Sequence, residues 1–199
     1  MEIPTIMGHQ LTDRAVNTLN RYRLMAYPDM ETELIIQAEQ QYMQRRYRTA
    51  LPVQPTGIVV AEFMAREDME ATLIRWMHRI ISIQPSFRVN IQGFGALSSK
   101  QLYMRVQEQQ PFQQLAGAMQ VVDQYIRSYD CPPAKRFTHP CLPLTEAVPD
   151  EEFEKVVLEY AGRKLNLSFE VKELLLIRNR HAAETGKQIN LFRLQPDRI

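Results

Sequence analysis

The sequence predicts an α+β fold in which the second half of the chain repeats the first half in its order of elements. In several stretches apolar residues recur at helical spacing, and in others they alternate with polar residues as in half-buried strands. In each half a strand, a helix and two further strands follow one another. We therefore expect two antiparallel sheets related by a pseudo-twofold axis, with helices on their outer faces.

The composition is that of an ordinary globular protein with one sizeable core. Of the 199 residues, 45% are hydrophobic and 24% charged, and the formal net charge is +1. This balance gives no general attraction to nucleic acids or membranes, so any anion site must be local. The two cysteines, Cys131 and Cys141, are too few for a disulfide framework and lack the spacing of a zinc site. No apolar run has the length of a signal peptide or a membrane span, so we expect a cytoplasmic protein. We find no Gly-rich phosphate loop and no metal-ligand spacing, and we expect no metal or cofactor.

Residues 1–20 are polar and are interpreted as an N-terminal extension, and residues 21–199 as one domain whose lobes are interleaved in sequence. Residues 22–27 predict a strand that ends at Pro28. Asp29 is a suitable N-cap for a helix over residues 30–48. The predicted buried face of this helix is Leu34, Ile35, Ala38, Tyr42 and Met43.

Residues 57–63 are strongly apolar and predict a strand. They lead into a helix over residues 66–83, whose predicted core stripe is Met69, Leu73, Trp76, Met77 and Ile80. Next comes a hairpin signal, in which Phe87, Val89 and Ile91 alternate with polar residues until Gly93 and Gly95 break the run. The partner strand contains Leu102, Met104 and Val106.

Pro111 begins a helix to about residue 129, with a core stripe of Phe112, Leu115, Met119, Val122 and Ile126. Residues 137–145 are strand-like, but Pro140 and Pro143 suit an edge or an interrupted strand. Pro149 opens a helix that stops near Gly162. Residues 167–177 and 188–194 close the chain as two strands, which we expect to be antiparallel.

From about residue 21 to residue 194 the chain resembles the 2H phosphoesterase superfamily, the group of 2′-5′ RNA ligase-like and cyclic phosphodiesterase proteins. The segments that carry the resemblance are Ala61-x-Phe63 with residues 69–77, the strand over residues 102–106, Gln110-Pro111-Phe112, Phe169-x-Val171-x-Glu173-Leu174 and Asn190-Leu191-Phe192. The resemblance implies a bilobal fold with a central cleft. It also implies two His-x-Thr motifs, one in each lobe. Strand residues two apart point the same way, so each motif presents an imidazole for proton transfer and a hydroxyl for phosphate oxygens.

Both motifs are degenerate in this chain. Counting from the flanking residues places the first motif on Gly57 and Val59, and the second on Cys141 and Pro143. Neither glycine nor valine transfers a proton. A thiol is a poor substitute for an imidazole, because its reference pKa of about 8.5 leaves it mostly neutral. Proline has no hydroxyl.

A second register places His139, two residues before Cys141, on the same face if the strand is regular there. His139 would then be the single imidazole in the cleft, although a water-exposed histidine at a loop edge is the plainer interpretation. Tyr103 and Arg105 alternate with core-facing residues, so they either border the cleft as ligand contacts or simply face solvent. The basic cluster of Arg45, Arg46 and Arg48 either contacts phosphates or is a solvated helix end.

Three functional hypotheses follow. The first is a protein with this fold that no longer catalyses and keeps a cleft for a nucleotide or an RNA end carrying a 2′,3′-cyclic phosphate, with His139, Cys141, Tyr103 and Arg105 as candidate contacts. The second is a weak 2′,3′-cyclic phosphodiesterase that uses His139. The third is an interaction protein whose cleft is filled by side chains. The oligomeric state does not follow from the sequence.

Overall fold

The computed structural model describes residues 19–52, 56–179 and 186–196. Most of the predicted N-terminal extension lies outside these residues. The first sheet has the strand order β5-β2-β1-β8-β9, with every neighbouring pair antiparallel. Its strands are β1 (Leu19–Ala26), β2 (Ile58–Arg66), β5 (Lys135–Arg136), β8 (Glu173–Asn179) and β9 (Lys187–Arg193).

The second sheet has the order β6-β4-β3-β7 and is also antiparallel throughout. Its strands are β3 (Phe87–Ala96), β4 (Leu102–Val106), β6 (Cys141–Pro143) and β7 (Asn166–Val171). The strand β6 is only three residues long and lies at the edge of this sheet. The prediction of an edge or interrupted strand near Pro140 and Pro143 is therefore confirmed.

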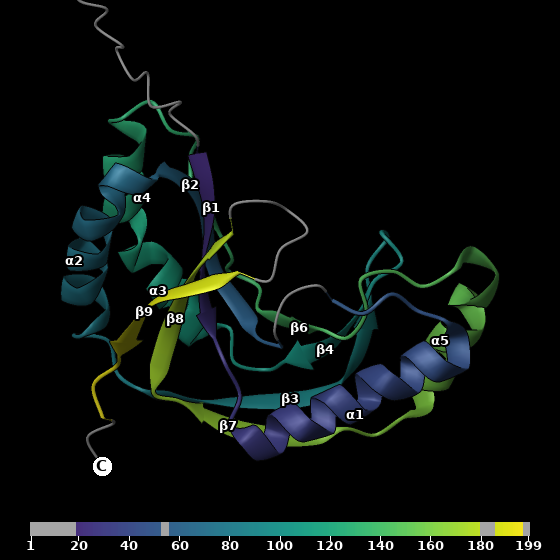
Figure 1. The fold of residues 1–199 in the computed structure, drawn as a ribbon. Helices are drawn as coiled ribbons and strands as arrows, with labels where there is room; N and C mark the ends of the chain where they lie inside the picture. Colours follow the sequence, from purple (N-terminus) through teal and green to yellow (C-terminus); the bar gives the residue numbers. More distant parts are fainter. Residues whose placement is uncertain (1–18, 53–55, 180–185, 197–199) are drawn as a thin grey trace, which may run out of the picture.

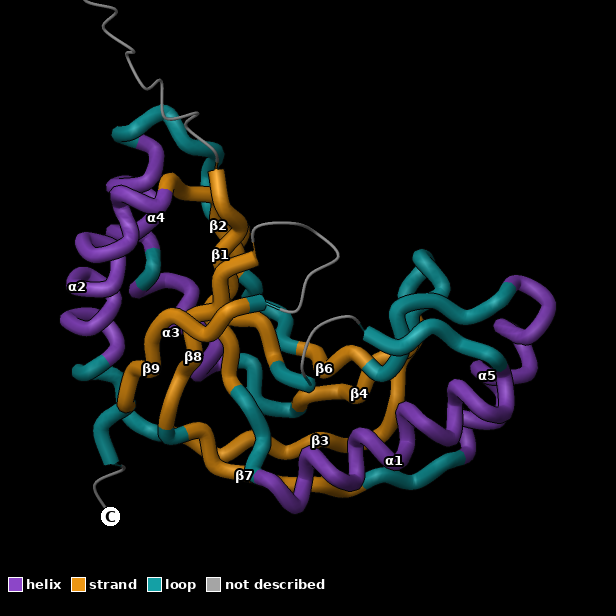
Figure 2. The backbone as a smooth tube through the Cα atoms, viewed as in Figure 1, coloured by secondary structure: helices purple, strands orange, loops and turns teal. Residues whose placement is uncertain are grey.

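Two groups of helices cover the two sheets (Figure 1). The helices α2 (Glu70–Ile81), α3 (Gln110–Ala118) and α4 (Gln120–Arg127) lie against the first sheet, and a short 3-10 turn (Glu67–Met69) precedes α2. The helices α1 (Met30–Tyr47) and α5 (Asp150–Gly162) flank the second sheet. Figure 2 shows the two lobes at an angle to each other. The predicted α+β fold with two antiparallel sheets and outer helices is confirmed.

The chain crosses from the second sheet to the first at Lys172, the single residue between β7 and β8. The sequence predicted one strand over residues 167–177, and this was wrong. Nothing in the local pattern marks the crossing, because apolar residues continue on both sides of Lys172. The backbone N–H of Leu194 donates to the carbonyl of Lys172 at 2.9 Å, which ties the crossing to the end of β9.

The helix over residues 111–129 is interrupted at Met119, where α3 ends and α4 begins. Its predicted core stripe is nevertheless buried throughout: Phe112, Leu115, Met119, Val122 and Ile126. In the same core, the rings of Tyr22 on β1 and Phe63 on β2 stack with centroids 5.3 Å apart. A stripe at helical spacing thus survives a break in the helix, since the two pieces keep the same side toward the sheet.

The start of α1 is as predicted, but its buried face is not. The carboxylate of Asp29 accepts a hydrogen bond from the backbone N–H of Thr32 at 2.8 Å, so Asp29 is the N-cap. Of the predicted face, only Met43 is buried, whereas Leu34, Ile35, Ala38 and Tyr42 are exposed. The buried side is Thr32, Ile36, Gln40, Met43 and Tyr47. Apolar residues occur on both sides of this helix, so spacing alone selected the wrong one.

Two smaller predictions also fail. Trp76 was assigned to the core, but it is 37% exposed and lies next to the guanidinium group of Arg79. Gly93 and Gly95 were expected to end a strand, but β3 runs through both of them to Ala96. The ladder shifts register between Ile91 and Phe94, where Gly93 has a φ of 69°. The glycine therefore forms a bulge and not a strand end.

No helix in the described part of the chain is long and apolar enough to cross a bilayer.

Candidate functional site

The second degenerate motif lies on one face of the second sheet, opposite two residues of β4. Cys141 pairs with Arg105, and Pro143 pairs with Tyr103. Residues directly opposite each other on antiparallel strands share a face, so these four side chains form one surface, which we call the β4–β6 face. Arg105 is exposed and Tyr103 is half-buried. No described residue forms an ion pair with Arg105.

Tyr103 is held over β3 by a glycine. A Cβ atom at Gly95 would lie 2.4 Å from Cζ of Tyr103, so only glycine leaves room for this ring. Gly95 is also the ladder partner of Tyr103. The ring of Tyr103 therefore lies over Gly95 of β3, on the side of β4 away from β6. The sequence analysis missed this role of Gly95 because it interpreted the residue as a strand break.

Cys141 is not an activated thiol. Its side chain is half-buried, and burial raises the pKa of its thiol above the ordinary value. A thiol becomes nucleophilic or basic only as the thiolate. Although Arg105 is its ladder partner, the effect of burial prevails, and Cys141 stays protonated at neutral pH.

The first motif position is closed by its own neighbours. Gly57 immediately precedes β2, and a Cβ atom there would lie 3.1 Å from the carbonyl oxygen of Ala26 and 3.1 Å from Cε of Met25. The ring of Tyr27 would lie 3.2 Å away. Burial raises the pKa of Tyr27 to about 12, and its hydroxyl lies 3.4 Å from the sulfur of Met25. Any side chain at position 57 would therefore make tight contacts with the backbone of Ala26 and the side chains of Met25 and Tyr27.

Val59, the second position of the first motif, has no side-chain group that can form a hydrogen bond. Its ladder partner is Met25, and the next opposed pair on the same face is Arg23 and Glu62. Nε of Arg23 lies 2.7 Å from the Glu62 carboxylate, and both side chains are about four-fifths buried. The carboxylate of Glu62 neutralises the charge of Arg23. Arg23 therefore contributes little positive charge for binding a phosphate in the first lobe. The pairing of Arg23 with Glu62 was not predicted.

His139 lies outside the strand. It is exposed in a bend before β6, and its Nδ1 is 3.1 Å from the hydroxyl oxygen of Thr138. The second register required a regular strand at His139, and that condition is not met. The other histidine of the described chain, His78, is on α2, where its ring packs against Phe192 with centroids 4.7 Å apart. The described part of the chain therefore contains no pair of histidines on facing strands.

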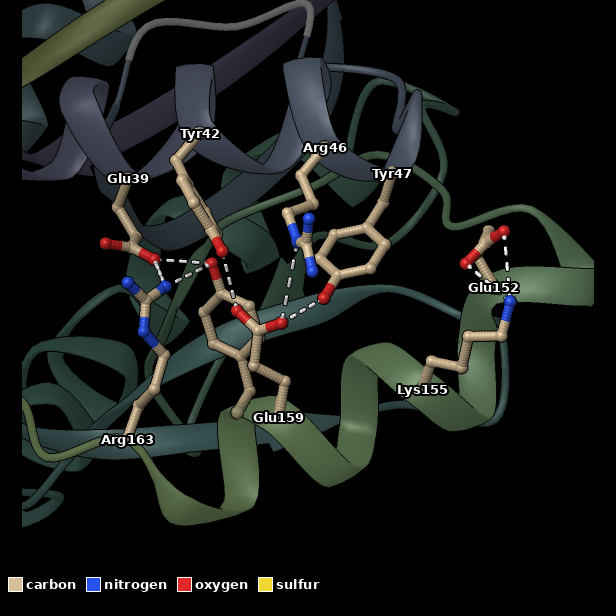
Figure 3. Close-up of polar contacts among 9 residues, drawn as sticks. Glu39, Tyr42, Arg46, Tyr47, Glu152, Lys155, Glu159 and Arg163 are labelled. Carbon is tan, nitrogen blue, oxygen red and sulfur yellow. Dashed lines mark hydrogen bonds and ion pairs between the residues drawn. The ribbon is translucent and has the colours of Figure 1, made fainter.

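The basic cluster at the end of α1 is an exposed helix end, and of its three arginines only Arg46 approaches a residue of α5 within the described chain (Figure 3). The carboxylate of Glu159 accepts hydrogen bonds from the hydroxyls of Tyr47 and Tyr42, the latter at 2.9 Å, and these bonds lower its pKa. Nε of Arg46 lies 3.9 Å from the same carboxylate. On the next turn, Arg163 pairs with Glu39. This arrangement joins two helices of one lobe, and we assign it to stability.

Comparison with known proteins identifies the architecture. No protein-family model matches the sequence, and no curated protein matches it by sequence. Solved structures do match. LigT of E. coli complexed with 3′-AMP superimposes with a TM-score of 0.62 at 16% identity, covering 89% of this chain and 98% of LigT. TT0787 of Thermus thermophilus gives 0.63 at 15% identity, covering 89% of this chain and 100% of that protein.

The chain has the LigT fold. A crystal structure described as a phosphoesterase also matches, with a TM-score of 0.56 at 15% identity. Further LigT structures in the comparison contain NADP+, ATP or phosphate. At these identities the likeness concerns the fold, so the function has to be argued from the residues of this chain.

Proposed function

We propose that this chain is a LigT-fold protein that has lost phosphoesterase catalysis and binds a nucleotide or a 2′,3′-cyclic phosphate RNA end on its β4–β6 face. The observation that carries the proposal is the tight packing at Gly57, where even a Cβ atom would lie 3.1 Å from a backbone carbonyl oxygen and 3.1 and 3.2 Å from two side chains. One member of an acid–base pair contributes about 10²–10⁴-fold to a rate. Here neither motif supplies such a member.

The second motif supports the same conclusion. Cys141 is held in the thiol form by burial, and Pro143 has no hydroxyl for a phosphate oxygen. His139 is an exposed residue of a bend. A water-exposed imidazole without an orienting partner on a strand is a weak general acid, so residual turnover by His139 is the less favoured alternative.

Binding is proposed for Tyr103 and Arg105. Arg105 is exposed and unpaired within the described residues, and its guanidinium group suits a phosphate. The half-buried ring of Tyr103 offers a surface on which a base can stack. LigT itself has been crystallised with 3′-AMP, ATP and phosphate, which supports a nucleotide as the ligand class for this fold.

The test is phosphorus NMR of the protein with 2′,3′-cyclic nucleotides and a short RNA that ends in a cyclic phosphate. We expect line broadening without a new phosphomonoester signal. Arg105→Gln should abolish the broadening, and the matched control Arg75→Gln, an exposed arginine of α2 on the other lobe, should leave it unchanged.

A new phosphomonoester signal that disappears in His139→Ala would instead establish the phosphodiesterase. No broadening and no turnover would refute both activities and favour an interaction protein with a filled cleft.

A further inference from the structure

Helix α1 has a second apolar surface, which faces away from the second sheet and adjoins α5 at Tyr42, whose hydroxyl donates to Glu159. Met30, Leu34 and Tyr42 are 78%, 60% and 36% exposed. Together with the exposed Ala38 they recur every four residues, so they form a continuous row, which we call the outer stripe. The buried residues of α1 lie on the opposite side and already complete its packing on the second sheet. Exposed apolar side chains that form one continuous row can serve as an interaction surface.

The C-terminal half of the outer stripe carries a shallow, open hollow. The hollow has a volume of about 440 Å³ and is lined by Ala38, Gln41, Tyr42, Arg45 and Arg46. The first four of these stand at positions i, i+3, i+4 and i+7. In knobs-into-holes packing, four residues at this spacing receive one apolar side chain from the facing helix.

The two ends of α1 carry opposite charges. Glu31 and Glu33 are in its first turn, and Arg45 and Arg46 are in its last turn. Across residues 19–52, 56–179 and 186–196, neither Glu31 nor Arg45 has an oppositely charged partner. Two parallel copies of this helix would bring like charges together. Two antiparallel copies bring the acidic end of each to the basic end of the other, so the surface is complementary to itself.

We propose that two copies of this chain associate through the outer stripes of their α1 helices, antiparallel across a twofold axis. Leu34 of each copy enters the hollow of the other. In that register Ala38 lies near the axis, where its small side chain permits close approach, and Glu31 faces Arg45 of the other copy. A self-complementary contact of this kind closes after two copies. Because it involves one helix per copy, we expect a reversible dimer with a micromolar dissociation constant.

This dimer goes beyond the proposed ligand binding and does not depend on it. Tyr103 and Arg105 are on strand β4, and no residue of that strand takes part in the outer stripe.

The test is sedimentation velocity of the full chain from about 1 µM to about 0.5 mM. We expect a concentration-dependent dimer. Leu34→Lys places a cation in the hollow beside Arg45 and Arg46 and should raise the dissociation constant at least about 30-fold. The matched control is Leu158→Lys on α5, where the leucine is 76% exposed but lies outside the stripe, and it should leave the dimer intact. Circular dichroism verifies that both variants fold.

A charge exchange tests the antiparallel register. Glu31→Arg and Arg45→Glu should each weaken the dimer by placing like charges opposite each other, and the double variant should restore it. A chain that stays monomeric at about 0.5 mM, or a dimer that Leu34→Lys does not affect, would overturn the proposal. Failure of the double variant to recover would refute the register.

Discussion

Replacing Gly57 by alanine tests the packing that closes the first motif position. The new Cβ would lie 3.1 Å from the carbonyl oxygen of Ala26, 3.1 Å from Cε of Met25 and 3.2 Å from the ring of Tyr27. The end of the Met25 side chain can shift, but Ala26 is the last residue of β1 and pairs with Ile58 on β2. The substitution therefore overpacks a region that includes fixed backbone. We expect a loss of about 1–3 kcal/mol in the free energy of unfolding.

The assay is urea denaturation supported by calorimetry. For a chain of this size a change of 1 kcal/mol moves the melting temperature by about 2–4 °C, so Gly57→Ala should lower it by about 2–12 °C. The matched control is Gly117→Ala in α3, where a Cβ would meet nothing within 4 Å. That substitution should stabilise the chain by about 0.5–1 kcal/mol, because alanine is the better helix former.

We therefore expect the free energy of unfolding to fall in Gly57→Ala and to rise in Gly117→Ala. If Gly57→Ala were as stable as the parent chain, the space at this position would be open. The main support for the loss of catalysis would then fail, and Gly57→His would become a realistic way to restore an imidazole.

Three further predictions concern other contacts. Because burial raises the pKa of Cys141, its alkylation by iodoacetamide should reach half-maximal rate at a higher pH in the folded chain than in urea, as read by mass spectrometry; equal midpoints would contradict the burial. Thr145→Val leaves the buried N–H of Leu102 without its 3.0 Å acceptor and should cost about 1–3 kcal/mol in urea denaturation, whereas Thr145→Ser should cost less. Asp29→Ala removes the N-cap of α1 and should cost about 1 kcal/mol, with Asp29→Asn close to the parent; equal losses in both would refute capping as the cause.

The order of the elements was predictable from local pattern because most strands and helices here have one apolar side. The hairpin of β3 and β4 and the stripe of α3 and α4 follow directly from spacing. Spacing failed for α1, where Gln40 belongs to the buried side and its amide donates to the carbonyl of Pro143 at 3.3 Å. A polar residue buried by a tertiary hydrogen bond cannot be recognised from periodicity.

The sequence was sufficient to predict which positions form the site. It was not sufficient to predict which side chains surround those positions. Counting residues placed the motif positions on Gly57, Val59, Cys141 and Pro143. What surrounds them depends on pairings between distant strands, such as Cys141 with Arg105 and Arg23 with Glu62. Gly95 illustrates the difficulty: its function is to make room for the ring of Tyr103, and local sequence does not report which residue lies across a ladder.

The first sheet takes β1 and β2 from the beginning of the chain and β8 and β9 from its end, with Arg21 paired to Asn179. At translation rates of about 5–20 residues per second, β1 emerges roughly 8–30 s before its neighbour β8 exists. During that interval the backbone of β1 on that side is an unpaired strand edge, the kind of surface that recruits other strands. Closure of this lobe therefore has to wait until β8 and β9 have left the ribosome.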